Sequence, residues 1–151
     1  MGTRRNYQRR ATGNDSPLHV LPVVADLIDY TLNLTDNAKH FPKKIRFTIV
    51  NRIQERVLSI YENLLEANEI FPIRNESDKA KRLELQRAAL TDCKLLLFYI
   101  ELSKKRGYID TGTFEYWAKK TLDVKFMSAA WYKSEQEPAE KAQAGPDEEH
   151  N

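Results

Sequence analysis

The chain has 151 residues, enough for one domain with a single core. Its 5 glycines and 6 prolines are few, which disfavours a fold of many short strands and favours a few long helices. The one cysteine, Cys93, excludes an intrachain disulfide, and the histidines lack metal-ligand spacing. The longest stretch without a charged residue, Ser16 to Ala25, is too short to cross a bilayer. We therefore expect a cytoplasmic chain with no membrane contact, no cofactor and no bound metal.

Charge is unevenly distributed along the chain, although the formal net value is only +2. Residues 1–16 carry four arginines and one aspartate, whereas residues 134–151 carry six acidic side chains and one lysine. Neither segment has a periodic apolar face, and such compositions are typical of disorder. We therefore predict a basic disordered arm over residues 1–16, a helical domain over residues 17–133 and an acidic disordered tail over residues 134–151.

Four segments of the central domain have apolar residues three and four positions apart, the period of a helix. The expected helices are, in chain order, one from Leu18 or Pro22 to Ala38, one from Pro42 to about Glu69, one from an N-cap at Ser77 to Arg106, and one from a cap within residues 110–113 through Trp131. Proline in a first turn and glycine after a last turn, as at Gly107, support these ends. Four helices with short connections predict an all-α fold, an antiparallel up-down-up-down four-helix bundle.

The third expected helix contains a surplus of apolar residues. Residues 95–100 are six apolar residues in succession, which cover the whole circumference of a helix. Either this helix is the most central of the four, or its surplus surface meets another subunit, and we favour the second interpretation. We therefore predict assembly as a ring of identical chains. Trp117 and Trp131 are expected to pack in the core or at this interface rather than to stack on bases. The candidate interface residues are Leu95, Leu97, Phe98, Trp117 and Trp131.

An antiparallel bundle brings the end of the first and third helices beside the start of the second and fourth. Basic residues collect at that end. For the basic residues that close the third helix, the helix dipole is one explanation and an anionic partner is the other. Lys43 and Lys44 differ, because they lie in a first turn, where the dipole disfavours a cation by about 0.3–1 kcal/mol. An anionic partner, above all nucleic acid, explains them, and a merely solvated face is the alternative. The candidate nucleic-acid-binding residues are Lys39, Lys43, Lys44, Arg46, Arg52, Arg56, Lys104, Lys105 and Arg106.

Motifs for catalysis are missing from the sequence. There is no glycine-rich phosphate loop, no nucleophile elbow and no Glu-x-x-His pair for a di-iron bundle. Glu62 and Glu66 lie one helical turn apart, but no matching acidic pairs accompany them, and Cys93 falls among apolar neighbours. We therefore expect no catalytic site and a protein that is not an enzyme.

Several segments carry a resemblance to a known family. They are His-Phe-Pro-Lys-Lys-Ile-Arg-Phe-Thr-Ile at residues 40–49, Asn-Arg-Ile at 51–53, Leu-Leu-Glu-Ala-Asn at 64–68, Arg-Leu-Glu-Leu at 82–85 and Gly-Tyr-Ile at 107–109. Together with small residues before Trp131, this pattern resembles the accessory variability determinant (Avd) family over about residues 20–132. Relatives of that family include four-helix proteins encoded by intervening sequences in bacterial large ribosomal RNA genes.

The resemblance implies a non-catalytic four-helix protein that assembles as a ring of five. Such a protein accompanies the reverse transcriptase of a diversity-generating retroelement, binds that enzyme and the template RNA, and supports error-prone copying of a template repeat into complementary DNA. The partners implied are the reverse transcriptase, RNA or its DNA copy, and further copies of the chain in a homopentamer. The alternative is an interaction protein of the intervening-sequence type without a reverse transcriptase partner.

Overall fold

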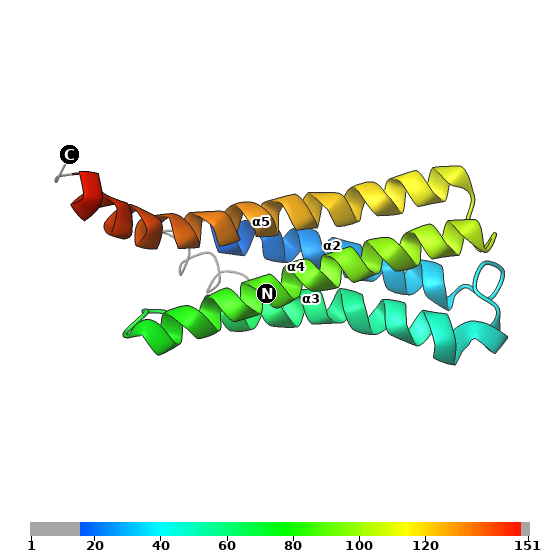
Figure 1. Ribbon diagram of the computed structural model, residues 1–151. Coiled ribbons are helices and arrows are strands. Elements are labelled where there is room, and N and C mark those ends of the chain that lie inside the picture. Colours follow the sequence, from blue (N-terminus) through cyan, green and yellow to red (C-terminus); the bar gives the residue numbers. More distant parts are fainter. Residues whose placement is uncertain (1–15, 149–151) are drawn as a thin grey trace.

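The computed structural model describes residues 16–148, and within them side chains from residue 19 to residue 136. Four long helices lie side by side: α2 (Ser16–Asp36), α3 (Asn51–Glu69), α4 (Glu76–Lys105) and α5 (Thr111–Glu148). Helix α2 packs against α3 and α5, and α4 packs against the same two helices (Figure 1). The described residues contain no strand, which confirms the prediction of an all-α, four-helix fold. The expected basic arm lies outside the described residues, except that Ser16 begins α2.

Two of the three connections meet at one end of the bundle. Figure 1 shows the α2–α3 and α4–α5 connections at the same end, and the α3–α4 connection at the other. Phe41 of the first connection is buried and packs on Tyr108 of the second, with ring centroids 5.6 Å apart. Gly107 ends α4 in the left-handed backbone region, at φ 78°, as expected for a residue that follows a helix. We call this end the paired-connection end.

The core is formed by the inward stripes of the helices. On α3 the buried residues from Ile53 to Ala67 follow the predicted period. On α5 the residues buried at spacings of four and three include Trp117 and Trp131. The indole nitrogen of Trp117 donates to the Thr31 hydroxyl at 3.0 Å. Both tryptophans are therefore buried inside one bundle, and their assignment to a subunit interface is wrong because the period of α5 directs them inward.

The start of the second predicted helix differs from the prediction. The regular helix α3 begins at Asn51 rather than at Pro42, after a 3-10 turn (Lys43–Ile45) and a π-helix (Arg46–Val50). In an uninterrupted α-helix, the inward face that contains Ile53 and Val50 would also contain Arg46. The wider π turn instead leaves Arg46 exposed and Ile45 partly buried. A change of helix type thus keeps a cation in solvent.

The caps of the last two helices are side chains of the preceding connections. The Asn75 side chain accepts from the Asp78 amide at 2.8 Å, so Asn75 caps α4 and the expected cap at Ser77 is wrong by two positions. Asp110 caps α5 by accepting from the Thr113 amide at 2.7 Å, within the predicted cap region. This backbone hydrogen bond is the main cause that lowers the pKa of Asp110.

The C-terminal boundary of the domain also differs from the prediction. Helix α5 continues to Glu148, whereas we expected a tail without regular structure from residue 134. Glu135 is part of the bundle: its Oε1 accepts from Nη2 of the buried Arg82 at 2.6 Å and from the Trp131 indole at 3.1 Å. Lys79 lies 3.5 Å from its other carboxylate oxygen. The boundary was missed because Glu135 is held by an ion pair to α4, which an apolar period does not reveal.

Candidate nucleic-acid interface

Exposed cations surround the paired-connection end. The packing of Phe41 on Tyr108 holds the two connections together, and His40 lies near enough to Asp110 to help lower its pKa. The basic side chains of both connections are exposed, and no ion pair neutralises any of them within the described part of the chain. We call this set the basic pole, and it comprises Lys39, Lys43, Lys44, Arg46, Lys104, Lys105 and Arg106. The structure thus brings together most of the predicted nucleic-acid-binding residues.

The local structure changes the electrostatic argument for Lys43 and Lys44. Both lysines lie in the 3-10 turn, which the π-helix separates from the regular helix α3. The dipole penalty is therefore smaller than for the first turn of an uninterrupted helix. No acidic residue lies in the first turn of either segment or of α3, whereas α4 begins with Glu76 and Asp78. The case for an anionic partner consequently rests on the concentration of unpaired cations rather than on the dipole.

Cations that follow a helix have a simpler explanation. Lys104 and Lys105 lie in the last turn of α4, where the dipole favours positive charge. The Lys104 ammonium also lies 4.6 Å from the centroid of the Phe114 ring, a cation–π contact with the start of α5. Their location is therefore accounted for by the bundle itself, although both side chains remain exposed and add to the positive potential of the pole.

Arg52 and Arg56, one turn apart on α3, have different environments. Arg52 is exposed, but Nη1 of Arg56 donates to Oδ1 of the buried Asp92 at 3.0 Å. The other carboxylate oxygen of Asp92 accepts from the Ser59 hydroxyl at 2.6 Å and the Asn63 amide at 2.9 Å. The charge of Arg56 is therefore already neutralised by Asp92, and its assignment to the nucleic-acid interface stays a prediction. An aspartate within the apolar sequence before Cys93 was the signal that a partner was needed.

The apolar surplus of α4 is partly exposed. Within residues 95–100, Leu96 and Ile100 are buried in the core, while Leu95 and Phe98 remain exposed, Phe98 to 55%. On α5, Phe126 is exposed to 61%. Large exposed apolar side chains on adjoining helices are a common mark of an interaction surface. Of the predicted interface residues, Leu95, Leu97 and Phe98 are thus the ones available at the surface.

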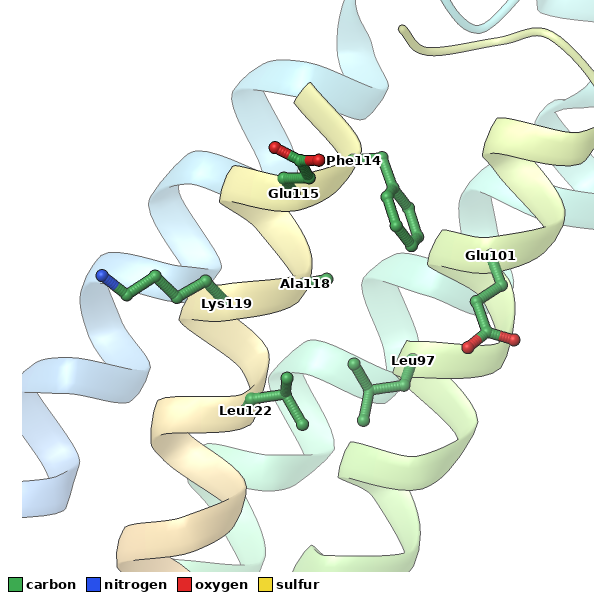
Figure 2. A pocket seen from close by; sticks show the side chains of 7 residues that line it. All are labelled: Leu97, Glu101, Phe114, Glu115, Ala118, Lys119 and Leu122. Carbon is green, nitrogen blue, oxygen red and sulfur yellow. The ribbon is translucent and has the colours of Figure 1, made fainter. Parts of the chain in front are cut away.

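A shallow groove of about 400 Å³ lies between α4 and α5. Figure 2 shows Leu97 of α4 and Leu122 of α5 pointing toward one another across it, with the Phe114 ring above them. Glu101 lies on the α4 side, whereas Lys119 extends away from the groove (Figure 2). The groove is apolar at its centre and charged at its edges, so it suits a protein surface better than an anionic chain.

No family model, curated protein or solved structure matches this chain.

Between residues 16 and 148, no helix has the length and apolarity that crossing a membrane requires. No group of three or more histidine, cysteine or carboxylate side chains in that same part could hold a metal ion. Burial, and then the neighbouring Asp92, raise the pKa of the Cys93 thiol to about 12. This thiol is therefore protonated and enclosed at neutral pH.

Proposed function

We propose that this protein is a member of the accessory variability determinant family. In this proposal it is a non-catalytic, cytoplasmic accessory protein of a diversity-generating retroelement, and it binds the reverse transcriptase and the template RNA or its DNA copy. The observation that carries the proposal is the location of the segment with the densest resemblance. Residues 40–49 supply Lys43, Lys44 and Arg46, three exposed and unpaired cations of the basic pole.

The bundle topology and assembly are part of the same proposal. Alternation of the connections between the two ends supports an antiparallel up-down-up-down order (Figure 1). The exposed Leu95 and Phe98, with Leu97 beside them in the groove, support contact with another copy of the chain. A closed ring of five would repeat the basic pole five times around an axis, which multiplies weak phosphate contacts without any new residue.

We expect phosphate contacts to dominate binding by such a pole, because its exposed cations neutralise phosphates whatever the base sequence. The test is fluorescence anisotropy with labelled single-stranded RNA over a salt series. Lys43→Glu with Lys44→Glu should weaken binding and flatten the log–log salt dependence by about 0.7 for each phosphate that is no longer neutralised. The matched control is Lys94→Glu with Lys133→Glu, which changes the net charge equally at exposed sites that lie outside the pole and form no ion pair within the described residues. Equal affinity and slope for both double variants would contradict the proposal.

The reverse transcriptase partner needs a separate test. A gene for a reverse transcriptase and a template repeat beside the gene for this protein are expected. The purified enzyme should then be retained by the tagged protein at physiological salt. If neither is found while RNA binding persists, the intervening-sequence type of interaction protein becomes the better description.

A further inference from the structure

Phe47 is an aromatic residue in an environment of cations. Its side chain is 81% exposed, and it lies in the π-helix Arg46–Val50. Arg46 precedes it directly, Lys43 lies four positions before it and Arg52 five positions after it, and all three are exposed. The described part of the chain offers the Phe47 ring no aromatic or cation–π partner. The bundle itself therefore gives no reason for an aromatic side chain at this position.

The π-helix fixes where these groups lie. The Asn51 amide donates to the Arg46 carbonyl, five residues back, so the turn that contains Phe47 is wider than an α-helical turn. Arg52 consequently lies about one turn after Phe47 along the helix, and Lys43 lies in the 3-10 turn that precedes the π-helix. The ring is thus exposed between cations that precede and follow it.

We infer that Phe47 stacks on an unpaired base, and that the nucleic acid taken by the basic pole is single-stranded. The inference rests on the proposed nucleic-acid binding and specifies its substrate class. Cations that follow a phosphate backbone, together with an exposed ring on which bases stack, form the usual combination in proteins that bind single strands. Bases in a duplex are stacked on one another, so their faces are not available to the ring.

The charges around Phe47 distinguish this surface from the apolar surface of α4 and α5. Those two helices expose several apolar side chains, including Leu95, Phe98 and Phe126. Phe47 instead has the exposed polar residues Arg46 and Thr48 as its direct neighbours. A protein partner with an apolar face would have to desolvate these cations, whereas a nucleic-acid strand would neutralise them.

The test compares Phe47→Ala, Phe47→Trp and the control Phe71→Ala by fluorescence anisotropy on the full chain. Phe71 is 77% exposed, at the other end of α3, so the control removes an equally exposed ring outside the basic pole. The probes are fluorescein-labelled strands of about 12 nucleotides, a length within the range of single-strand sites. They are an RNA strand, a DNA strand of the same sequence, an abasic DNA strand of the same length and the corresponding RNA duplex.

The expected result is that Phe47→Ala weakens binding of the two base-containing strands about tenfold, while Phe47→Trp and Phe71→Ala retain wild-type affinity. Because no charge is removed, the salt slope should not change, and binding of the abasic strand and the duplex should stay as in the wild type. A larger effect on RNA than on DNA would identify the RNA as the strand that Phe47 contacts, and the reverse would identify the DNA copy.

Two results would overturn the inference while leaving nucleic-acid binding in place. One is equal affinity of Phe47→Ala and wild type for the RNA and DNA strands. The other is an equal weakening on the abasic strand, since a probe without bases cannot stack. Failure of the wild type to bind any of the probes would overturn the proposed function together with this inference. Circular dichroism of each variant shows whether the fold is retained, and the tryptophan variant tests stacking independently of the alanine substitution.

Discussion

The two arginines on α3 allow a matched test of which cations serve the bundle and which are free to bind. Arg52→Ala and Arg56→Ala remove the same charge at positions one turn apart. Arg56 is paired with Asp92 at 3.0 Å, whereas Arg52 is exposed. We therefore expect Arg56→Ala to lower the stability of the fold without affecting RNA binding. Arg52→Ala should weaken RNA binding and leave the stability nearly unchanged.

The magnitude for Arg56 follows from the burial of the two side chains. Removing one partner of a fully buried ion pair costs about 3–5 kcal/mol. The Asp92 side chain is 6% exposed, but that of Arg56 is 35% exposed, so water can replace part of the interaction that the substitution removes. Ser59 and Asn63 also continue to donate to Asp92. We expect a destabilisation of about 2 kcal/mol, which corresponds to a fall in Tm of about 4–8 °C for a chain of this size.

Thermal unfolding followed by circular dichroism measures the stability change, and the anisotropy salt series measures the binding change. Arg52→Ala should change stability by less than about 0.5 kcal/mol and flatten the salt slope by about 0.7. The double variant Arg56→Ala with Asp92→Ala should be more stable than the sum of the two single effects predicts. The reasoning would be refuted if Arg56→Ala unfolded at the wild-type temperature and flattened the RNA salt slope.

The remaining predictions concern assembly, the buried thiol and the end of the domain. Phe98→Glu should leave the circular dichroism spectrum of the helices unchanged, because this side chain is 55% exposed. The same substitution should reduce the mass measured by light scattering. A wild-type mass near 17.6 kDa at micromolar concentration would contradict assembly. With its pKa raised to about 12, Cys93 should react with a disulfide reagent at pH 8 only as fast as the bundle opens, so rapid labelling of the folded protein would argue against this burial. A chain ending after Lys133 should unfold at a lower temperature than one ending after Gln136, because only the shorter chain lacks Glu135; equal unfolding temperatures would show that the contacts of Glu135 with Arg82 and Trp131 contribute little.

The helices could be predicted from the sequence because their main signal is local. The apolar period of α3 from Ile53 onward and Gly107 after α4 depend on residues within one segment, and both agree with the structure. The irregular start of α3 could not be predicted in this way. The π-helix follows a connection whose Phe41 packs against Tyr108 of another connection, and it leaves Arg46 exposed. The contact between Phe41 and Tyr108 joins residues far apart in the sequence, so the apolar period of one segment does not reveal it.

Ion pairs between helices are a second feature that the apolar period does not reveal. Asp92 is paired with Arg56 of α3, and Glu135 of α5 with Arg82 of α4. Each pair joins two helices, so neither partner can be identified from spacing along one of them. A carboxylate inside an apolar stripe does indicate that a partner is needed, because an isolated buried charge is very costly. The sequence therefore indicates that Asp92 needs a partner, but it does not identify Arg56 as that partner.

The same reasoning explains which predicted nucleic-acid-binding residues remain available. Arg56 lies on the flank of α3 that packs against α4, where a cation can be used to neutralise a buried carboxylate. Lys39, Lys43 and Lys44 lie on a connection at the end of the bundle and stay exposed. Residues on a connection have no facing helix to pair with, so their charge is directed to solvent or to a partner. An anionic strand would thus meet the bundle at its paired-connection end, where Phe47 is also exposed, rather than along the packed flanks of the helices.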